Sequence, residues 1–329
     1  MMTLTKVELR RLFSRRLTLI ALLGALAVTG LLLSEVYQQA KPLSGLQLSF
    51  QKSQFDQAHK SWETNGVQQV QECQKQQAIT QKSDPKANFH CNEMEPKWAN
   101  WGKPKVKFVD LMQSNLLNWS YLITFIAFLI GSGFVAAEFS SGSMGNWLTF
   151  EPRRMRVYVS KLAAAGVGLI PATLALLGLL FAGVWVISAH FGSTAGTTPK
   201  MWSDLERMAS RSLALAVAAA VVGAAMGTLL RHTAAVFGIA MGYLVIVEGI
   251  FGHLLQYSQP WLLRLNMTGW LQHGTKYYIQ TCKTDTQGNF RCDGIEKFLG
   301  FGHSRTYLGI LAVLVIALSA MVFQRRDVN

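Results

Sequence analysis

The chain has 329 residues, of which 50% are hydrophobic and only 15% are charged, and its mean hydropathy is +0.23. This composition excludes an ordinary soluble domain, in which about a quarter of the residues are charged. The formal net charge of +13 could indicate nucleic-acid binding. However, the arginines gather at alternate ends of apolar runs, so we expect the charge to set membrane topology and expect no nucleic-acid partner.

Six long apolar runs follow one another along the chain. A helix needs about 20 mostly apolar residues to cross the hydrocarbon core, and each run has or approaches this length, the fifth only if Glu248 is tolerated. We therefore predict an all-α polytopic membrane protein with six transmembrane helices, an N-terminal interfacial helix and two sizeable external regions. The predicted spans are residues 17–35, 111–138, 158–190, 206–230, 233–253 and 305–324.

The first segment, residues 1–16, mixes apolar and basic residues, which predicts a helix lying in the inner interface. A plain positive flank is the alternative. The first apolar run could instead be a signal peptide, but no small-residue cleavage pattern follows it, so we expect an anchor. The positive-inside rule places both termini in the cytoplasm of a cell membrane, together with residues 139–157, 231–232 and the tail 325–329.

The remaining connections are then external: residues 36–110, a short loop at 191–205, and residues 254–304. The first region carries good helix formers at 45–79 and predicts a mainly helical domain. In the last region, the residues around 284–289 predict a β-hairpin of two short strands with Gly288 in its turn.

All four cysteines fall in the two long external regions. The simplest of the three possible connectivities pairs Cys73 with Cys91 and Cys282 with Cys292, because each pair then closes one loop within one region. A metal site formed by Cys73, His90 and Cys91 is an alternative, but its spacing matches no common zinc pattern. We therefore expect two disulfides and no metal.

Two features lie within the predicted spans. Small residues are dense in the third and fourth spans, including Gly166, Gly168 and the stretch 218–227, and they permit close approach between helices. Glu248 stands near the external end of the fifth span. An acidic group there faces a substrate pathway or gate, forms a structural hydrogen bond, or simply reaches the outer interface.

The connection between the second and third spans, residues 138–161, is the most informative stretch for function. Its residues 140–151 are too polar for lipid, yet positions 144, 147, 148 and 151 share one helical face on which three of the four are apolar. Such a face beside basic residues predicts a helix that docks in a partner's groove. The alternative is an interfacial helix packed on lipid with Trp147 at the headgroup level.

The spacing E-F-x-x-G-S-x-x-x-x-L-x-x-x-P-x-R from Glu138 to Arg154, with Lys161 seven residues later, resembles the type-2 ABC exporter permease family. The basic N-terminal segment, the six spans and the ending VFQRRDVN resemble that family as well. The resemblance implies a short coupling helix that docks on a separate ATP-binding subunit. The docking residues that it implies are Glu138, Gly142, Met144, Trp147, Leu148, Pro152, Arg153 and Arg154.

The resemblance further implies a permease subunit that moves a lipid, an amphipathic drug or a peptide, together with a second permease copy or homologue and membrane lipids. It would be non-catalytic and carry no cofactor, with ATP and Mg on the partner ATPase. The chain itself has no G-x-x-x-x-G-K-[ST], H-E-x-x-H or G-x-S-x-G motif. A membrane sensor or assembly protein with a ligand-binding external domain is the alternative, and a membrane-embedded enzyme such as a lipid transferase is a weaker one.

Overall fold

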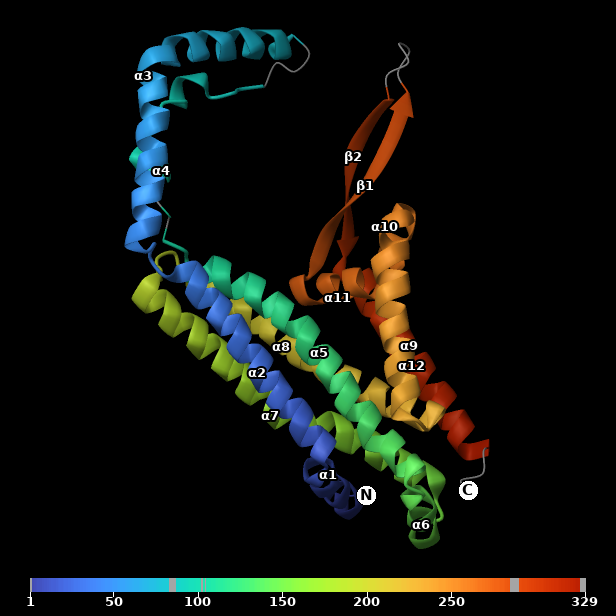
Figure 1. Cartoon of the computed structure of the whole chain (residues 1–329). Coiled ribbons are helices and arrows are strands. Elements are labelled where there is room, and N and C mark those ends of the chain that lie inside the picture. Colours follow the sequence, from blue (N-terminus) through green and yellow to red (C-terminus); the bar gives the residue numbers. More distant parts are fainter. Residues whose placement is uncertain (1, 83–86, 102, 104, 285–289, 326–329) are drawn as a thin grey trace.

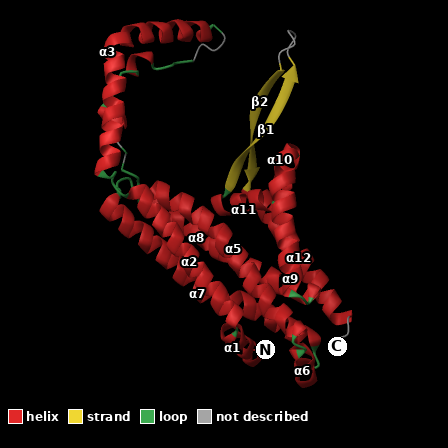
Figure 2. Cartoon of the chain, in the orientation of Figure 1, coloured by secondary structure: helices red, strands yellow, loops and turns green. Residues whose placement is uncertain are grey.

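The fold is that of a computed structural model, which describes residues 2–82, 87–101, 103, 105–284 and 290–325. Most of the described chain is helical, and its one sheet is a hairpin (Figure 2). The helices are α1 (Met2–Ser14), α2 (Arg16–Ala40), α3 (Gly45–Gln81), η1 (Cys91–Glu93), α4 (Trp98–Trp101), α5 (Phe108–Ser140), α6 (Ser143–Phe150), α7 (Arg154–Phe191), α8 (Pro199–Leu230), α9 (Thr233–Gly242), the π-helix η2 (Tyr243–Phe251), α10 (Gly252–Leu254), η3 (Gln256–Trp261), α11 (Leu263–Gln272) and α12 (Phe301–Arg325). The strands are β1 (Gly274–Thr284) and β2 (Phe290–Gly300).

Six helical segments of the described chain are long and apolar enough to cross a membrane: α2, α5, α7, α8, α9 with η2, and α12. This agrees with the predicted membrane protein of six spans. Several helices run beyond the predicted spans; α8, for example, begins at Pro199 rather than near residue 206. The early start has a local cause, because the Thr198 side chain accepts a hydrogen bond from the Met201 N–H and Pro199 occupies the first turn.

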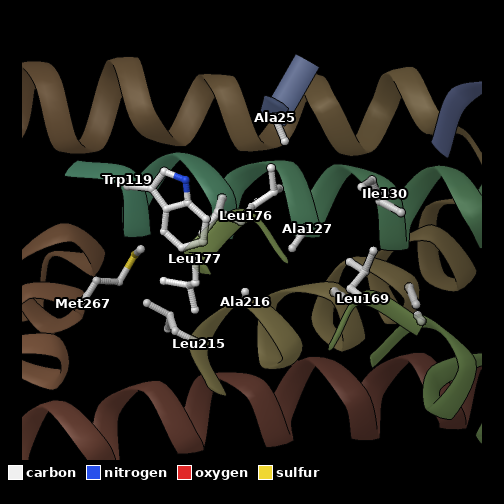
Figure 3. Packing of buried hydrophobic residues seen from close by; sticks show 14 of the residues in the cluster. Ala25, Trp119, Ala127, Ile130, Leu169, Leu176, Leu177, Leu215, Ala216 and Met267 are labelled. Carbon is white, nitrogen blue, oxygen red and sulfur yellow. The ribbon is translucent and has the colours of Figure 1, made fainter. Parts of the chain in front are cut away.

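The spans α2, α5, α7 and α8 lie side by side, while α9 and α12 lean away from them (Figure 1). The small residues of α8 bring it very close to α5: a Cβ added at Gly223 would lie 2.1 Å from the carbonyl oxygen of Phe128. The predicted close approach between helices is thus present. Buried side chains from α2, α5, α7, α8 and α11 meet in one core, part of which is drawn in Figure 3.

The segment between α2 and α5 contains the 37-residue helix α3, which projects away from the spans (Figure 1). It starts with a capping box, in which Ser44 and Gln47 exchange hydrogen bonds. The helical character predicted for 45–79 is confirmed. A disulfide joins Cys73 on α3 to Cys91, so the two sulfurs are bonded to each other rather than placed as metal ligands with His90.

The segment between η2 and α12 contains α11 and an antiparallel hairpin. The predicted hairpin is present, but its strands are longer than expected: β1 and β2 have 11 residues each and pair continuously from Gly274 with Gly300 to Thr284 with Phe290. The predicted turn residue Gly288 lies outside the described residues. Cys282 and Cys292 are opposite each other in this register, as the local pairing requires, although the Cys282 side chain is likewise outside the described part.

Candidate functional site

A short helix, α6, forms the connection between α5 and α7. The chain leaves α5 through Gly142, whose φ of +70° lies in the left-handed region that favours glycine after a helix end. Helix α6 then ends at Phe150, and α7 begins at Arg154. In Figure 1, α6 lies at the same end of the molecule as α1 and the C-terminal end of α12.

Beside α6, five charged side chains from three helices form what we call the charge cluster: Glu8 and Arg11 of α1, Arg15 at its junction with α2, Glu138 of α5 and Lys161 of α7. Lys161 Nζ donates to both oxygens of Glu8, at 3.0 and 3.1 Å, and also to Glu138 Oε2. Arg15 Nη2 donates to Glu138 Oε1 at 2.7 Å, while Arg11 lies 4.0 Å from the same oxygen. The cluster therefore ties the ends of α5 and α7 to the N-terminal helix.

Its centre is sealed from solvent. Glu8, Glu138 and Lys161 are all buried, whereas the two arginines reach the surface. Burial raises the pKa of Glu8, and the positive charge of Lys161 opposes this rise. Buried charges of this kind depend on one another, because removing one partner leaves an uncompensated charge, at a cost of about 3–5 kcal/mol.

Helix α6 is attached to the cluster through Trp147. The guanidinium of Arg11 lies 4.6 Å from the centroid of the Trp147 ring, and Lys161 Nζ lies 5.9 Å from it. These distances are within the range of cation–π attraction, worth roughly 0.5–2 kcal/mol. Met144, one turn earlier on α6, is also buried. A displacement of α6 would thus disturb the charged groups that hold α1, α5 and α7.

The eight residues predicted to dock a partner separate into two groups. Glu138 and Met144 are buried inside the chain, so their predicted contact with a partner is corrected: Glu138 binds Lys161 and Arg15, and Met144 packs in the core. Trp147 is half-buried against the cluster, and the side chain of Leu148 lies outside the described part of the structure.

The outward side of the connection carries the other residues. Gly142, Pro152 and Arg153 are exposed, and Phe150, which the sequence pattern did not single out, is 85% exposed. Arg154 is turned toward α12, where it donates to the carbonyl oxygens of Phe323 and Gln324 at 3.5 and 3.3 Å. The surface available to a partner therefore combines one apolar aromatic residue with a basic one.

Sequence reasoning also missed Glu8, Arg11 and Arg15 as members of a site. Glu8 offered a signal, since it is the first acidic residue of the chain and stands in a strongly basic segment. An isolated acid among basic residues at the edge of the membrane suggests a specific partner. Its partner, Lys161, is 153 residues away, and no local spacing connects the two.

Glu248 lies on the π-helix η2 and supports the start of α11. Its Oε1 accepts hydrogen bonds from the hydroxyl of Tyr243 and from the backbone N–H of Arg264, both at 3.0 Å. Tyr243 in turn accepts from the N–H of Leu263 at 3.1 Å. Helix N-termini have unsatisfied N–H groups and favour negative charge. The structural hydrogen-bonding alternative is therefore present, and the substrate-pathway role stays a prediction.

Comparison with known proteins adds one match. The family described as "Protein of unknown function (DUF2705)" matches residues 79–329, which include α6, Glu138, Lys161 and every candidate span except α2. None of the curated proteins and none of the solved structures matches the chain. Because the matched residues make up more than half of the sequence, the chain belongs to the DUF2705 family.

Proposed function

We propose that this chain is the membrane-spanning subunit of an ABC exporter, which couples to separate ATPase subunits through α6. The observation that carries the proposal is the contact of Trp147 with a buried charge cluster. A loop that only reversed the chain would not need a helix anchored to the ends of two spans and to α1. In our proposal, movement of a docked ATPase displaces α6, and the cluster passes this displacement to α5 and α7.

The docking surface that we propose is smaller than the set implied by the sequence motif. Phe150 supplies an exposed apolar anchor, and the exposed residues Pro152 and Arg153 follow it along the chain. An aromatic residue in a groove with a charged rim is a common way for a short helix to bind a partner. The complementary groove on the ATPase would be apolar with an acidic edge.

The proposed topology follows from the arginine distribution and the arrangement of the termini. The N-terminal helix, α6 and the end of α12 lie at one end of the molecule (Figure 1), and this end carries the arginine-rich segments. We therefore place it in the cytoplasm of the cell membrane. Helix α1 would lie in the inner interface, with Leu12 buried against Gly168 of α7.

The complete transporter would contain a second permease copy or a homologue, and ATP and Mg would bind the ATPase subunits. This chain would then be non-catalytic. Its cargo class, a lipid, an amphipathic drug or a peptide, rests on the resemblance of its membrane part to the type-2 exporters.

The test first identifies an ABC ATPase that co-purifies with the full chain, and then reconstitutes the two purified proteins. Phe150→Asp combined with Arg153→Glu should abolish complex formation, measured by size-exclusion chromatography, and the stimulation of ATP turnover. Phe298→Asp is the matched control, because Phe298 is an exposed aromatic residue of the hairpin, on a different element from α6. Unchanged binding and turnover in the α6 variant would refute the proposed docking surface.

A second candidate function, a membrane sensor or assembly protein, is favoured by α3. This helix projects from the spans and carries exposed large apolar side chains, including Leu46, Phe50 and Val67, which could bind a partner. The two candidates differ in nucleotide turnover. A stable complex with an ATPase that turns over ATP supports the exporter, whereas an α3-dependent complex without turnover supports the sensor.

A further inference from the structure

A cavity of about 590 Å³ lies at the other end of the molecule from α6, between the first turns of α8, the start of α5 and the end of α11. This volume is in the range of small-molecule sites, roughly 300–1,000 Å³. Figure 1 shows α11 lying beneath the hairpin at this end. Neither the charge cluster nor α6 contributes to the cavity.

The polar side of the cavity has an excess of positive charge. Its lining includes Lys200, Arg207 and Arg211 but one carboxylate, Asp204. Asp204 is already bound to Arg207, with 2.7 Å between Oδ1 and Nη2. A ligand that enters the cavity would therefore meet cationic groups without a competing free carboxylate.

Arg211 is the most informative of these residues. Its guanidinium is part-buried, donates to the carbonyl oxygen of Leu271 at 3.3 Å and lies 5.1 Å from the ring centroid of Phe301. Within the described residues, no carboxylate lies within 4.0 Å of it. A cation in a helix long and apolar enough to cross a membrane is costly and usually has a polar or anionic partner. The carbonyl oxygen of Leu271 and the ring of Phe301 are both uncharged, so a bound anion would supply a charged partner.

The opposite side of the cavity is apolar. It is lined by Met201, Leu205, Met208 and Leu271, of which the last three are buried. Methionine side chains are unbranched and adapt to apolar groups of different shapes. One cavity thus places an adaptable apolar wall beside a cluster of cations.

We infer that this cavity binds an amphipathic anion, with a phosphate or carboxylate head at Arg211 and Lys200 and an apolar part against Met208 and Leu205. Arginine suits such a head group, because its planar guanidinium can donate two parallel hydrogen bonds to phosphate or carboxylate. The assignment does not depend on the proposed coupling to an ATPase. It concerns binding by this chain alone.

The test is calorimetric titration of the purified full chain in a neutral detergent with three probes. Dihexanoyl phosphatidylglycerol presents head and tail together, dihexanoyl phosphatidylcholine has no net charge, and inorganic phosphate has no tail. We expect phosphatidylglycerol to bind at least about tenfold more tightly than either of the others, as for a hydrogen bond to a charged group. Equal affinity for phosphatidylcholine, or for inorganic phosphate alone, would overturn the inference.

Substitutions of cavity residues test whether phosphatidylglycerol binds in this cavity. Arg211→Gln should weaken phosphatidylglycerol binding about tenfold or more, and Arg305→Gln, an exposed residue of α12 that does not line the cavity, should leave it unchanged. If the Arg211 variant does not fold, the exposed pair Lys200→Gln and Arg207→Gln provides the same test at the cavity rim. Full affinity in a folded Arg211 variant or in the rim variant would overturn the inference.

Discussion

Lys161→Met is the most direct perturbation of the charge cluster, because it removes the cation between two buried carboxylates. Lys161 contacts both oxygens of Glu8 and one oxygen of Glu138. After the substitution, Glu138 keeps Arg15 at 2.7 Å, whereas Glu8 loses its closest cation. Methionine has a similar length and fills the same space, so lost packing contributes little to the effect.

The expected loss follows from the fate of Glu8. Without Lys161, the buried carboxylate takes up a proton, which at pH 7 and an ordinary pKa of 4.5 costs about 2.5 × 1.36, or about 3.4 kcal/mol. This is the upper limit of the loss, because burial already raises the pKa of Glu8 in the wild type, which therefore carries part of the cost. This value agrees with the roughly 3–5 kcal/mol found when one member of a buried ion pair is removed. At pH 5 the same protonation costs only about 0.7 kcal/mol, so the destabilisation should nearly disappear in acid.

The assay is unfolding by SDS titration in mixed micelles, followed by tryptophan fluorescence, for wild type, Lys161→Met and Lys161→Met/Glu8→Gln. The double variant should recover most of the stability at pH 7, since Gln fills the site of Glu8 without a charge. Unchanged stability of Lys161→Met at pH 7 would refute the reasoning. So would a double variant less stable than the single one.

Two further predictions concern pH and helix packing. Burial raises the pKa of Glu8, so the stabilisation by its protonated form is fully present below pH 4.5 and is lost as the pH rises through the raised pKa. Glu8→Gln should remove the pH dependence that comes from this group, as measured by SDS titrations between pH 4 and 8. An unaltered pH profile in this variant would contradict the assignment. Gly223→Ala should destabilise the chain by about 1–3 kcal/mol, because its Cβ would lie 2.1 Å from the oxygen of Phe128. The control Gly178→Ala has no atom within 4 Å of its Cβ, so equal unfolding midpoints for the two variants would show that the α5–α8 contact is not tight.

Much of the fold could be predicted from the sequence because crossing a membrane is a local requirement. Each span must contain about 20 apolar residues, and this length can be recognised without knowledge of the neighbours. The helical α3 and the pairing of Cys73 with Cys91 also follow from local composition and spacing. Strand length was harder to predict, because β1 and β2 mix polar and apolar residues with little regular alternation.

The candidate site was only partly predictable for a related reason. A motif placed a short helix between the second and third spans, and its period identified an apolar face. Helical periodicity does not determine whether that apolar face points outward to a partner or inward to the rest of the chain. In the structure, Met144 is buried and Trp147 lies against Arg11 of α1 and Lys161 of α7, whereas Phe150, Pro152 and Arg153 are exposed.

The sequence by itself thus determined that this protein has six candidate spans, a basic end and a helix in the 138–161 connection, because hydropathy, charge and period are properties of neighbouring residues. Only the tertiary structure brought Glu8 to Lys161 and Arg15 to Glu138, across 153 and 123 residues of chain. It also set Glu248 at the start of α11 and Arg211 beside a cavity. The physical reason is that a buried charge is stabilised by the groups that surround it in space, and their identity depends on how the helices pack.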